Sequence, residues 1–160
     1  MTIFSRTKKQ IIMTYVWDTN IFIHSLRKPT FFSNITKQYN SFNPVNKLFI
    51  SSVTIGELHA FALRNRWGSR RIAEMEQMIN LATPIDVTDN PFLIKMYAEI
   101  DVYSQSQHPT LRLPTSARKM GKNDLWIAAT ATIHNATLLS TDADFEHLDS
   151  LFLYFERIIV

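Results

Sequence analysis

The sequence predicts an α/β fold with a mainly parallel central sheet. Short runs of β-forming residues alternate with longer runs of helical spacing along the 160-residue chain, which is typical of strands joined by crossover helices. No repeat or long linker divides the chain, so one domain is expected. Helices cover both faces of such a sheet, and its ligands bind at the carboxyl ends of the strands.

The predicted elements follow one another in a regular order. The first half of the chain predicts a strand, a helix, a loop around a short helix, a strand and two helices, at residues 15–17, 21–26, 29–44, 48–53, 55–66 and 69–81. The second half predicts a strand, a helix, a polar loop, a buried Ala-rich helix and two strands, at residues 85–87, 92–103, 104–122, 124–134, 137–140 and 151–160.

Two of the predicted helices carry an apolar stripe at helical spacing. The stripe of the 69–81 helix and that of the 92–103 helix consist of Ile72, Met75, Ile79 and Ala82, and of Phe92, Met96, Ile100 and Tyr103. The segment 29–44 is instead rich in Pro, Ser and Asn, which favours a loop. Residues 1–12 are expected to form an N-terminal extension to a domain spanning 13–160, because Met13 opens the first strand-like run and resembles a natural start.

The composition excludes several classes of protein. Cysteine is absent, which rules out thiol nucleophiles, cysteine-ligated zinc and a disulfide scaffold, and favours the cytoplasm. Only 3 glycines occur and none forms a phosphate-binding loop. The apolar runs are far shorter than the ~20 residues of a membrane-spanning helix, so no membrane association is expected. The net charge of +3 is compatible with a nucleic-acid partner but does not require one.

Acidic side chains recur where the predicted strands end. Asp18 follows the first strand, Glu57 lies in the first turn of the helix after the second strand, and Asp124 opens the Ala-rich helix. Asp142 follows the strand 137–140, with Asp144 two residues later. Each acid alone has an ordinary explanation as a helix cap or turn residue. Together they predict one cluster, because parallel strands bring their carboxyl ends to the same edge of the sheet.

Clustered carboxylates repel one another unless a cation or a proton neutralises them. Mg²⁺ and Mn²⁺ prefer oxygen ligands, and Mg²⁺ retains several of its waters. A divalent cation bound by acidic residues can activate a water, position it against a phosphodiester and stabilise the leaving oxygen. The acids therefore predict a metal-dependent phosphodiesterase, whose chemistry requires no histidine.

Four segments resemble the motifs of the PIN domain family, in the family's order. They read DTN, SVTIGEL, NDLWIAATA and STDADF, at residues 18–20, 52–58, 123–131 and 140–145. The third segment is the most specific match. The size and the motif spacing resemble the VapC-type toxins of bacterial and archaeal toxin–antitoxin pairs.

The resemblance implies a three-layer α/β/α fold and an Mg²⁺- or Mn²⁺-dependent endoribonuclease. It implies catalytic, metal-binding acids at Asp18, Glu57, Asp124 and Asp142, and an auxiliary metal position at Asp144. Asn20 and Ser140 are expected to form hydrogen bonds within the site, with Ser140 where the family usually has Thr. The resemblance also implies a homodimer and a cognate antitoxin. The antitoxin's C-terminal segment lies in the toxin groove, and operator DNA is bound only through the antitoxin.

Basic residues are expected to bind the RNA backbone beside the acids. The expected contacts precede or adjoin Asp124 and are Arg112, Arg118, Lys119 and Lys122. A second basic group lies at the junction of two predicted helices and consists of Arg64, Arg66, Arg70 and Arg71.

Two alternatives to the toxin remain open from the sequence. One is a catalytically silent PIN-like module that binds RNA or protein, and the other is a stand-alone RNA-processing nuclease. A phosphatase with Asp18 as nucleophile is disfavoured, because Asn20 stands where a second Asp is needed. The acids do not identify the RNA target.

Overall fold

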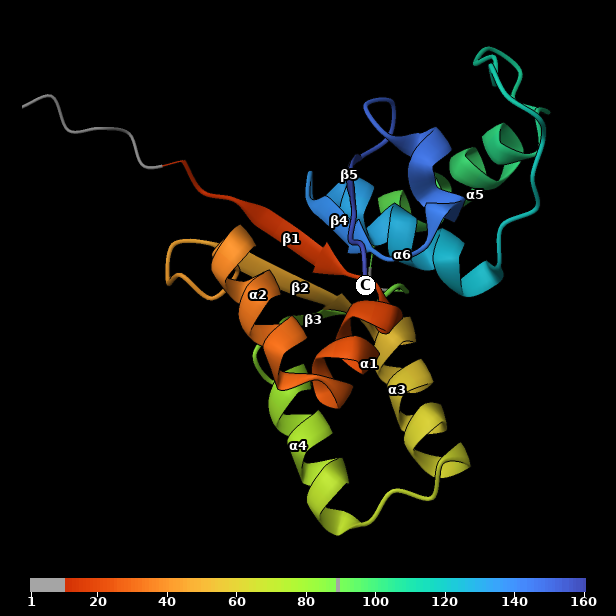
Figure 1. Ribbon diagram of the computed structural model, residues 1–160. Coiled ribbons are helices and arrows are strands. Elements are labelled where there is room, and N and C mark those ends of the chain that lie inside the picture. Colours follow the sequence, from red (N-terminus) through yellow and green to blue (C-terminus); the bar gives the residue numbers. More distant parts are fainter. Residues whose placement is uncertain (1–10, 89) are drawn as a thin grey trace, which may run out of the picture.

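A computed structural model of the chain describes residues 11–88 and 90–160 (Figure 1). Its centre is a five-stranded sheet with the order β3-β2-β1-β4-β5, and every pair of neighbouring strands is parallel. The strands are β1 (Thr14–Trp17), β2 (Lys47–Ser51), β3 (Thr83–Ile85), β4 (Thr137–Ser140) and β5 (Tyr154–Arg157). This confirms the predicted α/β class and shows that the described sheet is wholly parallel.

Crossover helices join the strands, as parallel pairing requires. The helices are α1 (Thr19–Arg27), α2 (Pro29–Tyr39), α3 (Ser52–Arg64), α4 (Ser69–Ile79), α5 (Pro91–Ser104) and α6 (Lys122–Ile133). A short 3₁₀ helix, η1 (Ala143–Leu148), follows β4. The segment between α5 and α6 has no helix or strand and extends away from the sheet (Figure 1).

The sheet separates two hydrophobic cores. Val16 packs with α5, α6 and η1 on one face, whereas its neighbours Tyr15 and Trp17 pack with α1, α2, α3 and α4 on the other. Leu138 and Leu139 of β4 divide between the faces in the same way. This alternation follows from the two-residue period of a strand, and it produces the predicted three layers.

The segment 29–44 is not mainly a loop, as the sequence had indicated. Residues Pro29–Tyr39 form α2, in which proline occupies the first turn and therefore leaves no helical hydrogen bond unmade. Ile35 is buried, and Phe31 and Phe32 pack against the core on this face. Asn40 ends the helix in the left-handed conformation, with φ 50°. Tertiary packing thus outweighs the polar composition of the segment.

Further details differ from the sequence predictions, among them the third strand, which spans Thr83–Ile85 rather than residues 85–87. The second strand ends at Ser51 rather than at Val53, because the Ser51 hydroxyl accepts a hydrogen bond from the Val53 N–H and caps α3. In α5, Leu93 is fully buried while Phe92 is 68% exposed, so Phe92 does not belong to the buried stripe. The other three stripe residues of α5 are buried or pack against the core.

The proposed N-terminal extension lies mostly outside the described residues, which begin at position 11. Ile11 and Ile12 are exposed. Within the described chain, none of the helices has the length and apolar character needed to cross a bilayer.

Candidate metal centre

The predicted acids come from four separate elements that meet at the carboxyl edge of the sheet. Asp18 directly follows β1 and Asp142 lies two residues after β4, which pairs in parallel with β1. Glu57 lies in the second turn of α3, which begins where β2 ends, and Asp124 is the third residue of α6. The parallel register therefore gathers residues that are far apart in the sequence.

Asp18 is the most enclosed of these acids, with 5% of its surface exposed. Its Oδ1 accepts a hydrogen bond of 2.7 Å from the Thr19 N–H, and its Oδ2 accepts one of 2.6 Å from the Ser140 hydroxyl. Burial raises the pKa of Asp18 to about 6, with smaller contributions from the charges of Glu57 and Asp142, while the two hydrogen bonds oppose the rise. The residue caps α1, but its burial and raised pKa exceed what a cap requires.

Ser140 connects three of the predicted site residues. Besides donating to Asp18, its Oγ accepts hydrogen bonds from the Asp142 N–H at 3.0 Å and from Asn20 Nδ2 at 3.2 Å. Asn20 Oδ1 accepts from the Thr141 N–H at 3.2 Å, which joins the start of α1 to the end of β4. The Ser140 hydroxyl thereby aligns the segment that carries Asp142 with the carboxylate of Asp18.

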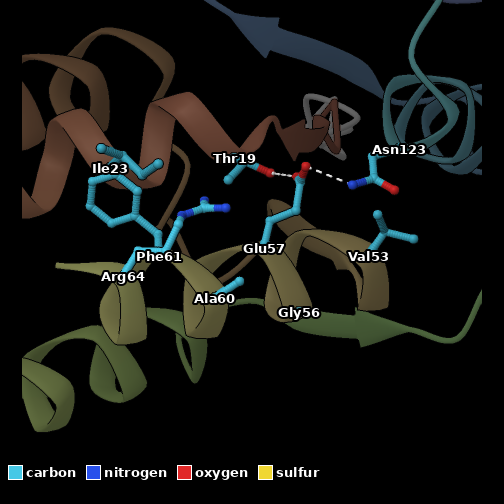
Figure 2. Close-up of a pocket in the computed structure, with 9 residues that line it drawn as sticks. All are labelled: Thr19, Ile23, Val53, Gly56, Glu57, Ala60, Phe61, Arg64 and Asn123. Carbon is cyan, nitrogen blue, oxygen red and sulfur yellow. Dashed lines mark hydrogen bonds between the residues drawn. The ribbon is translucent and has the colours of Figure 1, made fainter. Parts of the chain in front are cut away.

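Both oxygens of Glu57 accept hydrogen bonds from residues that the sequence did not single out. The Thr19 hydroxyl donates to Oε2, and Asn123 Nδ2 donates to Oε1 at 2.8 Å (Figure 2). Thr19 and Asn123 each stand next to a predicted acid in its motif. This adjacency was the feature of the sequence that could have identified them as site residues. That both side chains point toward Glu57 on α3 depends on the tertiary structure and could not be read from the sequence.

Asp124 experiences the charge of every other acid in the cluster. Partial burial raises its pKa to about 7, followed by the charges of Asp18, Glu57, Asp142 and Asp144. Gly121, the N-cap of α6, lies directly against it: a Cβ at this glycine would stand 3.0 Å from Asp124 Oδ2.

Asp142 and Asp144 lie at the open side of the cluster, and both are exposed. Asp142 Oδ1 accepts a hydrogen bond of 3.0 Å from the Asp144 N–H and caps η1. Asp142 therefore acts as a helix cap, and it also places a negative charge at the edge of the site.

The site fits a hydrated divalent cation better than a fully ligated one. In the described part of the chain, no three acidic or histidine side chains converge closely enough to bind an ion together. Two of the acids direct their oxygens to protein donors. Mg²⁺ retains several waters and needs only one or two carboxylates, and the mutual charge that raises the pKa of Asp124 favours a cation.

The basic residues predicted to bind RNA differ in their surroundings. Arg112, Lys119 and Lys122 are exposed, and Lys122 is the first residue of α6, two positions before Asp124. Arg118 is half-buried; its N–H donates to the Ser104 carbonyl at 2.8 Å, and its charge contributes to the lowered pKa of His147. None of the four forms an ion pair within the described residues.

The sequence model of the PIN domain matches residues 15–151. The chain belongs to the PIN domain family. The match covers all five acids as well as Thr19, Asn20, Asn123 and Ser140. No curated protein sequence matches this PIN domain.

Solved structures share its fold at low sequence identity. VapBC2 from Rickettsia felis bound to a promoter DNA fragment is 20% identical, with a TM-score of 0.72 over 91% of this chain and 98% of that chain. VapBC-1 from nontypeable Haemophilus influenzae is 22% identical, with a TM-score of 0.69 and the same coverage. DNA-bound VapBC from Salmonella typhimurium is 18% identical, again with a TM-score of 0.69 over 91% and 98% of the two chains. The α/β arrangement of this PIN domain is thus that of the matched chain in each of these structures.

Proposed function

We propose that this PIN domain is an Mg²⁺- or Mn²⁺-dependent endoribonuclease that hydrolyses RNA phosphodiesters. The observation that carries the proposal is the meeting of acids from four elements at one edge of the sheet, where burial, and after it the charges of four other carboxylates, raise the pKa of Asp124 to about 7. A stable fold has no need of such repulsion, which destabilises the cation-free protein. A site that binds a divalent cation offsets it.

The surrounding residues prepare the carboxylates for this cation. A bound divalent cation supplies Lewis acidity, an activated water and charge stabilisation at the phosphate. Ser140 positions Asp18, while Thr19 and Asn123 position Glu57. Asp124 and Asp142 complete the candidate catalytic set, with Asp144 as an auxiliary metal position. Asp124 would have to be ionised to hold a cation, because only the ionised carboxylate is a good ligand.

RNA binding requires positive charge around the acids, because carboxylates repel phosphate. We propose Arg112, Arg118, Lys119 and Lys122 for this role; the first three lie on the segment that leads into α6. Neutralising Arg118, Lys119 and Lys122 together should weaken RNA binding and flatten its salt dependence. An unchanged salt slope would remove these residues from the interface.

We further propose that the protein is the toxin of a type II toxin–antitoxin pair acting in the cytoplasm. The support is its family together with the VapBC complexes that share its fold. A cognate antitoxin would then inhibit it, a homodimer would be its working form, and operator DNA would be bound through the antitoxin. Expression in a bacterial host should arrest growth, and co-expression of an adjacent small reading frame should restore it.

A cleavage assay tests the catalytic proposal directly. Purified protein is incubated with RNA and Mn²⁺, with and without a chelator, beside an Asp124→Asn variant. We expect cleavage that the chelator abolishes and that the variant lowers by several orders of magnitude. Cleavage without metal, or equal cleavage by the variant, would reject the mechanism. RNA binding without any cleavage by the unmodified protein would support the silent binding module instead. Cleavage without growth arrest would favour a stand-alone nuclease.

A further inference from the structure

A groove between α1 and α3 opens directly from the acid cluster. It has a volume of about 560 Å³, within the range of roughly 300–1,000 Å³ found for small-ligand sites. Glu57 and Asn123 line one end, and Arg64 lies two helical turns further along α3 (Figure 2). Between them the lining is largely apolar and includes Ile23 and Phe61.

Arg64, the last residue of α3, differs from Arg70 and Arg71 in the first turn of α4. Arg70 pairs with Glu74 at 3.3 Å, and the guanidinium of Arg71 lies over the Trp67 ring, 4.6 Å from its centroid. Arg64 makes no ion pair within the described residues, and its side chain lies along the groove beside Phe61. Arg64 comes seven residues after Glu57 in the same helix. This spacing places the two residues on the same face of the helix, roughly 10 Å apart along its axis.

We propose that this groove binds the RNA strand immediately beside the phosphate that is cleaved. Arg64 binds a neighbouring backbone phosphate, and the face formed by Phe61 and Ile23 contacts the nucleoside between the two phosphates. This assignment rests on the proposed ribonuclease function and identifies a substrate subsite for it. Arg64 belongs to the second basic group identified in the sequence, whereas Phe61 and Ile23 were not among the residues expected to contact RNA.

The chemistry of the groove favours a nucleic acid over a protein segment. Glu57 of the acid cluster lines the groove, so a strand whose phosphate lies at the acids can continue along it. The guanidinium of Arg64, spaced along α3 from the acids, matches the repeating negative charge of an RNA strand. The aromatic ring adds a surface on which a base of any sequence can stack. The guanidinium of Arg27 lies over one face of the Phe61 ring, 5.0 Å from its centroid, and adds a second exposed cation beside the groove.

The test measures binding and does not depend on cleavage. A short fluorescein-labelled single-stranded RNA is titrated with the full chain carrying Asp124→Asn, in Mg²⁺, and the anisotropy is followed at several salt concentrations. Adding Arg64→Gln should weaken binding about five- to ten-fold and reduce the salt slope by about 0.7, the value for one phosphate contact on a single strand. Arg66→Gln is the matched control, because Arg66 is exposed in the connection between α3 and α4 and does not line the groove. It should change the affinity less than two-fold.

A second pair of measurements tests the aromatic face. Phe61→Leu keeps an apolar side chain but removes the ring, and it should weaken binding of the same RNA by about five-fold. An RNA with abasic positions should bind the Phe61 protein more weakly than intact RNA, and the Leu variant should lose this difference. Melting temperatures of all variants identify any loss of folding.

Unchanged RNA affinity and salt slope in Arg64→Gln would overturn the proposal and leave the groove to a protein segment. An equal loss in Arg66→Gln would overturn it as well, because general surface charge would then explain the effect. Failure of the ribonuclease proposal is a separate result: the unmodified protein would not cleave RNA with Mn²⁺, whatever the binding of these variants.

Discussion

Asn123 donates a hydrogen bond of 2.8 Å from its Nδ2 to Oε1 of Glu57, which lies 66 residues earlier on a different helix. Together with the Thr19 hydroxyl on Oε2, this bond sets the direction of a carboxylate that would otherwise rotate freely. The side chain directly before one candidate metal-binding acid thus positions another. A residue that positions a ligand affects metal affinity as well as turnover.

Asn123→Ala should therefore lower RNA cleavage by roughly ten-fold or more and raise the Mn²⁺ concentration needed for half-maximal activity. The measurement is cleavage rate against metal concentration. Asn80→Ala is a suitable control, because Asn80 ends α4 in an exposed position and its side chain makes no hydrogen bond to a described residue. A normal metal requirement in Asn123→Ala would contradict the positioning role.

Gly121→Ala should impair the site without unfolding the protein. The added Cβ would stand 3.0 Å from Asp124 Oδ2, so the carboxylate must move. Gly68→Ala makes the same exchange at the N-cap of α4, where nothing lies within 4 Å of the new Cβ. Both variants carry the same modest capping penalty, and thermal melts should show similar losses of stability. Only Gly121→Ala should lose cleavage activity, and equal activity in the two variants would argue against this account.

The raised pKa of Asp124 predicts a pH-dependent cost in the metal-free protein. The unfolded chain loses this proton near pH 3.8 and the folded chain near pH 7, so the folded state binds more protons between these values. Stability from this group is present at acidic pH and is lost as pH rises through about 7. Asp124→Asn should remove the loss and make the metal-free protein more stable at pH 8, by roughly 1–2 kcal/mol after solvent screening.

Urea unfolding of both proteins across this pH range provides the measurement, taken as the difference between them at each pH. The difference matters because His147, whose burial lowers its pKa to about 4, has the opposite trend: its contribution is lost as pH falls. Saturating Mg²⁺ should stabilise the unmodified protein more than the Asp124→Asn variant. A constant difference from pH 4 to pH 8 would show that Asp124 is not desolvated in this way.

Ser140→Ala should destabilise the protein, because it removes the donor to Asp18 Oδ2 and the acceptor for the Asp142 N–H. An unsatisfied buried group costs about 1–3 kcal/mol. Ser25→Ala is the control: Ser25 is also buried, but its hydroxyl has no hydrogen-bond partner within the described residues. Denaturant titrations should therefore give little change for Ser25→Ala. Equal losses for the two variants would exclude a special role for the Ser140 hydroxyl.

The order of strands and helices could be predicted because hydrophobic periodicity is local. Apolar runs such as residues 137–140 and the Ala-rich helix that follows Asp124 identify buried elements without knowledge of their partners. The helix Pro29–Tyr39 was harder to predict, because its polar composition favours a loop. It is stabilised by packing against the core that it shares with α1, α3 and α4.

The amino-acid sequence alone determined that acids recur near the ends of predicted strands and at the starts of helices, and that these acids match the motifs of one family. The sequence could not determine which side chains form hydrogen bonds with these acids. The contacts of Asn123 with Glu57, of Ser140 with Asp18, and the position of Arg64 in the groove depend on how helices from distant parts of the chain pack together. Spacing along a chain determines which residues share an element and a face, whereas hydrogen bonds between elements depend on side-chain directions that only the packed structure defines.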